Sequence, residues 1–254
     1  MMKEKEDMFS KFRNSFSKID GHFHILEQRV PVETQIEYFK YSEQIKKERQ
    51  NELTDIEFET FTDDLKDDET STEYKRYILS CLAVSRQVRA YRVLESYTKN
   101  SSEETHDWAC LAHMESRISL ESELSNEKQI YISTGLGGKG EKLRFYIMLP
   151  AKRKEAFTDL QRQIIEQEFN YYLQRDNCDV ERITICDLYV ELILLIPVRA
   201  NIKFTLDSII NECNLYGNFL HDRFTITNVK ELSEEDINDI LEKIYGNNYT
   251  SFEI

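Results

Sequence analysis

A glycine-rich segment carries the residues whose spacing best suits the binding of a ligand. Ser133-Thr134-Gly135-Leu136-Gly137-Gly138-Lys139-Gly140 holds four of the seven glycines. Backbone amides in such a loop can hold a phosphate, and Lys139 would add positive charge. A P-loop requires G-x-x-x-x-G-K-[ST] at the start of a helix, whereas this segment precedes a β-like run and lacks the Ser or Thr. We therefore expect a hairpin loop. The alternatives are a protein contact or an anion contact through Gly135, Gly137, Gly138, Lys139 and Gly140.

Two basic clusters have the side chains to contact phosphate or an acidic protein. The first recurs at three-residue spacing on one predicted helix: Arg86, Arg89 and Arg92. The second follows Pro150: Lys152, Arg153 and Lys154. Because Asp and Glu total 47 against 33 Lys and Arg, pairing with the chain's own carboxylates is the favoured interpretation for both clusters.

The sequence shows no catalytic or metal-binding arrangement. His22 and His24 form an H-x-H pair, which supplies two ligands with no third nearby. The five cysteines are odd in number and lack C-x-x-C spacing, which favours buried reduced thiols over disulfides or zinc ligands. No Ser-His-Asp, Cys-His or paired-carboxylate pattern stands out. We therefore expect a protein that is not an enzyme and binds no metal or cofactor.

Composition restricts the cellular location that we expect for the protein and the kinds of partner that it could bind. A net charge of -14 argues against a protein that binds nucleic acid over its whole surface. The first residues are too charged for a signal peptide, and the longest apolar stretch, Val190 to Val198, is too short to span a bilayer. We expect a cytoplasmic protein with no membrane partner.

The first half of the chain, residues 1–127, has helical periodicity. Apolar residues at helical spacing predict an amphipathic helix near the start, followed by an irregular or extended stretch: Phe9, Phe12, Phe16 and Ile19. A second helix is expected over 33–50, and the acidic stretch 51–72 suggests a loop with a short helix. Residues 73–124 resemble a HEAT-type helical pair, with a break near Ser85. No second copy follows at a 40-residue period, so a long solenoid is not predicted.

The second half, residues 128–254, alternates strands and helices. Predicted strands cover 129–134, 143–149, 180–186, 189–198 and 223–229. Predicted helices cover 154–175, 205–215 and 234–245, with Ser233 and Asp236 as a capping signal. From Leu143 to Val229 the order is β-α-β-β-α-β, typical of ferredoxin-like domains. The predicted class is α+β: a helical half, then a ferredoxin-like domain with an extra N-terminal strand and a C-terminal helix.

Residues 143–215 also resemble the ferredoxin-like core of the HUH-class single-tyrosine transposases. The likeness rests on Arg144-Phe145-Tyr146-Ile147-Met148-Leu149-Pro150-Ala151-Lys152-Arg153-Lys154 before a long helix. It continues with Val190-Glu191-Leu192-Ile193-Leu194-Leu195-Ile196-Pro197 before Thr205-Leu206-Asp207-Ser208-Ile209-Ile210.

The resemblance implies two metal-binding histidines one residue apart on the third strand and a tyrosine nucleophile on a later helix. The histidine positions fall on Tyr189 and Glu191, so the paired imidazoles are absent. Tyr245 and Tyr249 lie late in the chain, but without the metal ligands we do not assign the nucleophile. Common descent with the family would then mean that this chain has lost catalysis.

We therefore expect a non-enzymatic interaction or scaffold subunit of a cytosolic assembly, whose partners are other proteins or further copies of itself. The alternative is a catalytically inactive nucleic-acid-binding protein derived from a transposase-like fold. That protein would use the 152–154 cluster and the glycine-rich segment.

Overall fold

The chain divides into two units between Gly140 and Glu141. The computed structural model describes residues 22–49, 53–124 and 129–246. The amphipathic helix predicted from Phe9, Phe12, Phe16 and Ile19 lies outside these residues, as does Tyr249. Sequence pattern predicts the boundary after residue 127. Residues 129–140 instead belong with the helices, because they bond to a strand and a loop at residues 22–28.

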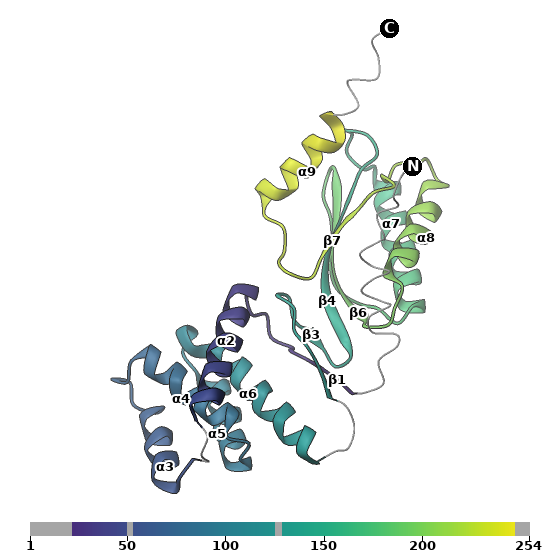
Figure 1. Cartoon of the computed structure of the whole chain (residues 1–254). Helices are drawn as coiled ribbons and strands as arrows, with labels where there is room; N and C mark the ends of the chain where they lie inside the picture. The colour runs from purple at the N-terminus through teal and green to yellow at the C-terminus, as the bar shows by residue number, and fades with distance from the viewer. Residues whose placement is uncertain (1–21, 50–52, 125–128, 247–254) are drawn as a thin grey trace, which may run out of the picture. The chain divides into compact units, whose positions relative to one another are not determined.

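Five helices make up most of the first unit: α2 (Val32–Glu48), α3 (Asp55–Asp64), α4 (Thr72–Val84), α5 (Val88–Asn100) and α6 (Glu103–Leu124) (Figure 1). Their core is centred on Trp108, whose ring lies 5.2 Å from that of Tyr38 in an edge-to-face contact. The indole N–H donates to the carbonyl of Arg76 and to Oγ of Ser80. Residues 73–124 form three helices, so the predicted HEAT-type pair is not confirmed.

A buried carboxylate joins two of these helices. Glu115 on α6 accepts hydrogen bonds of 2.6 Å from the hydroxyls of Tyr38 and Ser42 on α2. Lys46, also on α2, places its ammonium 2.5 Å from the same carboxylate. Burial and the neighbouring Glu115 raise the pKa of Tyr38 well above its usual value. These three contacts satisfy the charge and fix α2 against α6.

Three short strands complete the described part of the first unit. β1 (His22–Ile25) pairs in parallel with β2 (Gln129–Ile132), so that Phe23 lies opposite Ile130. β3 (Gly138–Lys139) follows in the glycine-rich segment. The prediction that the run at 129–134 is an extra strand of the ferredoxin-like domain is wrong. Its partner is β1, which lies in the stretch that periodicity indicates only as irregular or extended.

The second unit has the predicted β-α-β-β-α-β order. Its elements are β4 (Lys142–Pro150), α7 (Asp159–Arg175), β5 (Asp179–Ile185), β6 (Tyr189–Pro197), α8 (Ile202–Asn214), β7 (Thr225–Thr227) and the added α9 (Glu234–Gly246). β4 and β6 are central, with β7 beside β4 and β5 beside β6, and each pairing is antiparallel. This strand order confirms the α+β class and the ferredoxin-like core.

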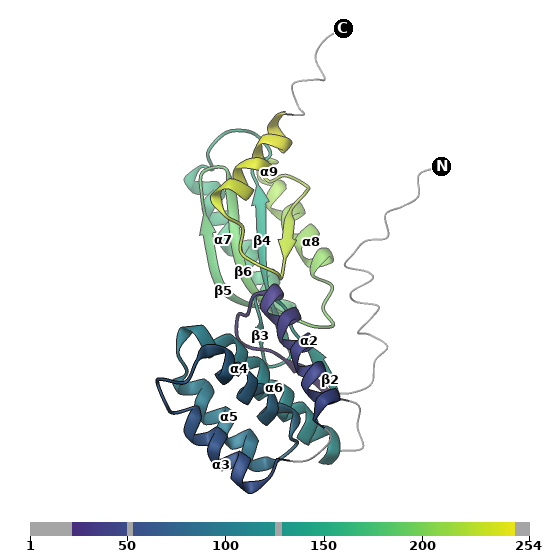
Figure 2. The ribbon, with the colours of Figure 1, turned by 60° about the vertical axis from the view of Figure 1, so that its left-hand side comes forward.

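Helices α7 and α8 lie on one side of this sheet, and α9 lies on the other (Figures 1 and 2). The α7–α8 side is held by buried apolar residues such as Ile165, Phe169, Leu206 and Ile209. Helix α7 begins at Asp159, five residues later than predicted, because Thr158 and Gln161 form a capping box.

The capping signal predicted before α9 is confirmed. The hydroxyl of Ser233 accepts from the amide of Asp236, and the carboxylate of Asp236 accepts from the amide of Ser233. Across the described part of the chain, none of the helices combines the length and apolar character needed to cross a membrane.

Candidate functional site

The sheet face away from α7 and α8 is the place where the transposase resemblance would put chemistry. Side chains alternate between the two faces of a strand, so Tyr189 and Glu191 on β6 share one face with Tyr146 on β4. The hydroxyl of Tyr146 donates to Glu191 at 2.5 Å. Burial, followed by the hydrogen bond to Glu191, raises the pKa of Tyr146. The carboxylate therefore has a fixed structural partner.

Ion pairs occupy the rest of this face. Arg182 on β5 donates to Glu231 at 2.6 Å, and this bond raises the pKa of the guanidinium. Arg144 on β4 donates through two nitrogens to Glu181, at 2.5 and 2.8 Å. Such bidentate pairs are the stronger kind. The charged groups of this face thus neutralise one another.

The donor set at the implied histidine positions does not fit a divalent metal. Burial, followed by a hydrogen bond to Cys186, raises the pKa of Tyr189 to about 12, so its oxygen stays protonated near neutral pH. Glu191 is engaged by Tyr146. No group of three or more His, Cys, Asp or Glu in the described ranges is arranged to hold a metal ion. We therefore derive no metal-dependent step.

Tyr245, which lies on a helix after the last strand, has a structural role in this fold. It is buried on α9, and its hydroxyl donates to the carbonyl of Ala151 at 3.1 Å. Burial raises its pKa. This bond anchors α9 to the segment that follows β4.

The glycine-rich segment packs on the first unit's own backbone. The amide of Gly138 donates to the carbonyl of Glu27, and the amide of Gly140 donates to the Glu27 carboxylate at 3.2 Å. Gly137 has a φ of +69°, and a Cβ there would lie 2.5 Å from the carbonyls of Glu27 and Gln28. The amides of Gly138 and Gly140 already have protein acceptors. The anion contact stays a prediction. An anion could bind these two amides only if it displaced the Glu27 oxygens that now accept from them.

The arginine stripe does not form as predicted. Arg86 precedes α5 with a φ of +55°, and its side chain lies 3.2 Å from Glu123. Arg89 pairs with Asp55 at 2.6 Å and lies over the ring of Phe58. Arg92 is exposed on α5. The break between α4 and α5 takes Arg86 off the helix, and the two ion pairs follow the favoured interpretation of pairing with carboxylates.

The second basic cluster lies beside a later loop. The amide of Lys152 donates to the carbonyl of Phe219, and its ammonium donates to Asn218 at 2.7 Å. The same ammonium lies 3.4 Å from Asp222. Arg153 and Lys154 are exposed, as is Arg223 in the neighbouring loop. The fold thus adds Arg223 to a cluster that the sequence limits to 152–154.

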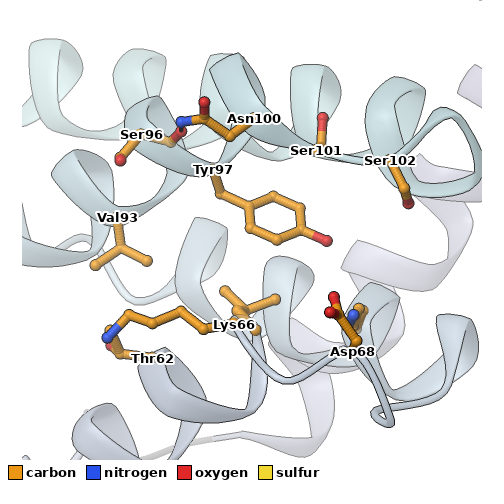
Figure 3. Close-up of a pocket in the computed structure, with 11 residues that line it drawn as sticks. Thr62, Lys66, Asp68, Val93, Ser96, Tyr97, Asn100, Ser101 and Ser102 are labelled. Carbon is orange, nitrogen blue, oxygen red and sulfur yellow. Dashed lines mark hydrogen bonds between the residues drawn. The ribbon is translucent and has the colours of Figure 1, made fainter.

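A pocket of about 570 Å³ lies in the helical unit between α3 and α5 (Figure 3). Tyr97 points into it from α5, opposite Lys66 and Asp68. The Tyr97 hydroxyl lies 3.0 Å from Oγ1 of Thr105, and Oγ of Ser101 lies 2.9 Å from Nδ1 of His106. Both hydroxyls thus have hydrogen-bond partners near the start of α6.

A cysteine and a histidine meet next to this pocket, a pairing that sequence reasoning missed. Nε2 of His106 lies 3.5 Å from Sγ of Cys110, one helical turn along α6. Burial raises the pKa of Cys110 to about 12, so the thiol is protonated near pH 7. The i,i+4 spacing of His106 and Cys110 is visible in the sequence, but the spacing does not show whether the thiol is buried.

Five large apolar residues are exposed on α7, on α8 and directly after the end of α8. They are between 61% and 77% exposed: Leu160, Tyr171, Phe204, Leu215 and Tyr216. We name these five the α7–α8 face. A hydrogen bond of 2.5 Å from Thr205 to Asp176 joins the start of α8 to the end of α7, so the helices run antiparallel. Helical periodicity predicts that Leu160 points inward. It is exposed because the buried residues Ile165, Phe169 and Leu173 lie on the opposite side of the helix.

Comparisons with known proteins were made for the whole chain. No family model and no curated protein matches the sequence. Among solved structures, it is similar to a candidate transposase from Deinococcus radiodurans R1 at 13% identity and a TM-score of 0.37, over 41% of this chain and 92% of that one. It is also similar to a REP-associated tyrosine transposase bound to a REP hairpin, at 12% identity and a TM-score of 0.32, over 51% and 76% of the respective chains. Both similarities are weak.

Proposed function

We propose that this chain is a non-enzymatic interaction subunit that binds a partner protein through the α7–α8 face. The observation that carries the proposal is that five large apolar side chains, three on α7 and α8 and two directly after α8, are mostly exposed. Contiguous exposed apolar surface marks interaction sites, because burying it releases about 25 cal/mol per Å². Tyrosine, which supplies two of the five, is enriched among the residues that dominate interface energies.

The same proposal includes that this chain does not catalyse a reaction. Its support is that the polar groups best placed for chemistry are engaged with one another. Glu191 accepts from Tyr146, Arg182 pairs with Glu231, and the Tyr245 hydroxyl is bonded to a backbone carbonyl. The Cys110 thiol is protonated. Each group has a structural role that accounts for its position.

Affinity purification from the native cell tests the proposal. Three forms of the full chain would be compared, each with and without nuclease. They are the wild type, a face variant with Tyr171→Glu and Leu215→Glu, and a control with Ile56→Glu and Val88→Glu, which are exposed apolar residues of the other unit. We expect the wild type and the control to recover the same proteins after nuclease and the face variant to lose them. Equal recovery by the face variant would overturn the proposal.

A second candidate function is nucleic-acid binding through the 152–154 cluster. The observation in its favour is that Arg153, Lys154 and Arg223 are exposed, in two segments that the Lys152–Asp222 ion pair joins. Fluorescence anisotropy with a labelled single-stranded oligonucleotide at several salt concentrations would measure binding. This candidate predicts a Kd that weakens steeply with salt, and weakens further in Arg153→Glu with Lys154→Glu. Binding that is absent, or unchanged in that variant, would exclude it.

A further inference from the structure

We propose that the pocket between α3 and α5 binds a small zwitterion, an amino acid or a dipeptide that carries one ammonium and one carboxylate. The pocket belongs entirely to the helical unit, so this inference is independent of the α7–α8 face and goes beyond the proposed function. Its volume of about 570 Å³ lies within the range of about 300–1,000 Å³ that is usual for small-molecule sites.

Two opposite charges line this pocket. Lys75 is a half-buried residue of α4, and Asp68 is an exposed residue of the link between α3 and α4 (Figure 3). In the part of the chain that the structure describes, neither side chain has an ion-pair partner, although both line the same pocket. A half-buried ammonium has lost hydration that a bound carboxylate would replace. Lys75 and Asp68 are therefore the two groups that a ligand can engage.

The other charged groups at the pocket have partners within the protein. The ammonium of Lys66, the third charge of the lining, lies 3.2 Å from the carboxylate of Asp63. Glu104, two residues beyond the lining Ser102, accepts a hydrogen bond of 2.8 Å from the hydroxyl of Thr72. The lining thus offers a ligand one ammonium and one carboxylate. A simple anion would meet an opposing charge at the carboxylate, whereas a zwitterion complements both groups.

An apolar wall defines the body of the ligand. Its members are Leu65, Val93 and Tyr97. The ring of Tyr97 points into the pocket from α5, opposite Asp68 (Figure 3). The Tyr97 hydroxyl lies 3.0 Å from Oγ1 of Thr105, which fixes the ring against the start of α6. An aromatic or aliphatic side chain packs well against such a wall. The ligand that fits is a zwitterion with an apolar side chain.

Isothermal titration calorimetry on the full chain tests this chemistry with four probes. L-phenylalanine and alanyl-phenylalanine represent the free amino acid and the dipeptide, and the tighter of the two identifies the source. 3-phenylpropionate lacks the ammonium, and phenylalaninamide lacks the carboxylate. We expect at least one zwitterion to bind at millimolar concentration or below. Each truncated compound should bind about tenfold more weakly than L-phenylalanine, because each loses one charge-assisted hydrogen bond.

Two charge-removing variants assign the contacts. Lys75→Gln should weaken L-phenylalanine about tenfold and leave the Kd of phenylalaninamide unchanged, because that probe has no carboxylate to lose. Asp68→Asn should weaken L-phenylalanine equally and leave 3-phenylpropionate no weaker. Asp67→Asn and Lys99→Gln, which change exposed residues outside the lining, are the matched controls and should bind as the wild type. Circular dichroism of each variant would confirm that it is folded.

Three results would overturn the inference. They are no binding of either zwitterion, binding of 3-phenylpropionate as tight as that of L-phenylalanine, and Lys75→Gln and Asp68→Asn proteins that bind L-phenylalanine as the wild type does. None of these results would affect recovery of partner proteins through the α7–α8 face. A failure of the pocket is therefore distinguishable from a failure of the proposed function.

Discussion

The hydroxyl of Tyr146 donates a 2.5 Å hydrogen bond to the carboxylate of Glu191 across the two central strands of the ferredoxin-like sheet. Glu191 stands at one of the two positions where the transposase resemblance implies a metal-binding histidine. The group that would face a metal there is instead part of a tyrosine–carboxylate pair inside the sheet. This hydrogen bond gives both polar side chains a partner within the sheet.

Removal of this hydrogen bond should destabilise the protein. Tyr146→Phe leaves the Glu191 carboxylate without its donor, and the loss of a bond to a charged, half-buried acceptor costs about 1–3 kcal/mol. Urea unfolding measures the change in the free energy of unfolding. The matched control is Tyr171→Phe, which removes the hydroxyl of an exposed tyrosine and should change stability by less than about 0.5 kcal/mol. Equal effects of the two substitutions would contradict the role of the pair.

The two glycines of the 133–140 segment with positive φ should differ sharply in their tolerance of alanine. At Gly140, φ is +59° and an added Cβ would have no atom within 4 Å, so Gly140→Ala should cost only about 1–2 kcal/mol of backbone strain. Gly137→Ala carries the same strain and adds a clash with two backbone carbonyls at 2.5 Å. Its free energy of unfolding should fall further than that of Gly140→Ala. A Gly137→Ala variant as stable as Gly140→Ala would show that this close approach does not exist.

Acid should weaken two helix N-termini. Backbone and side-chain hydrogen bonds from Thr54 lower the pKa of Glu57 at α3 to about 2, and the bonds from Ser233 do the same for Asp236 at α9. Both folded values lie below the ordinary carboxyl pKa of about 4. The stabilisation is therefore complete above about pH 4 and is lost as the pH falls toward 2.

Thermal unfolding between pH 5 and pH 2 would measure this loss. Glu57→Gln and Asp236→Asn should each start from a lower Tm at pH 5 and show a shallower decline with acid. Glu59→Gln, an exposed neighbour on α3, serves as the control and should follow the wild type. A decline as steep in both cap variants as in the wild type would argue against the assignment of these two carboxylates.

The five thiols should react at very different rates. Four are buried, and burial raises the pKa of Cys110 and Cys213 to about 12 and that of Cys178 to about 11. Cys186 is partly exposed. A colorimetric thiol reagent at pH 8 should modify one thiol quickly in the native protein and five after denaturation. Cys186→Ser should remove the fast phase. A fast phase that survives this substitution would show that a thiol we place in the core is accessible.

Much of the fold could be predicted from the hydrophobic pattern of the sequence. The rest depends on side-chain burial and strand pairing, which the pattern does not show. The runs at 143–149 and 189–198 are nearly continuous apolar stretches, so the central strands were predictable. The partner of β2 was not predictable, because β1 has only four residues, too few for its polar–apolar alternation to identify a strand. Leu160 fits a helical stripe with Ile164, yet it is exposed because the helix packs through Ile165, Phe169 and Leu173, which lie on its opposite side.

The candidate site was less predictable than the fold. The α7–α8 face consists of residues that look like core residues in a linear sequence, such as Phe204 and Leu215. Only the packing of Leu206, Ile209 and Ile210 against the sheet shows that the neighbouring positions point outward. Arg223 joins the 152–154 cluster through contacts about 70 positions apart in the chain, such as the one between Lys152 and Asp222. Local spacing cannot reveal such a contact.

Amide hydrogen exchange on the full chain, alone and in the complex recovered from cells after nuclease, gives the sharpest test of partner binding through the α7–α8 face. We expect partner binding to slow exchange in residues 159–175 and 202–216, which carry the face. Exchange in the glycine-rich segment and around 152–154 should be unchanged. Protection confined to 152–154 and 218–223, with the α7–α8 face exchanging as in the free protein, would show that the partner binds elsewhere.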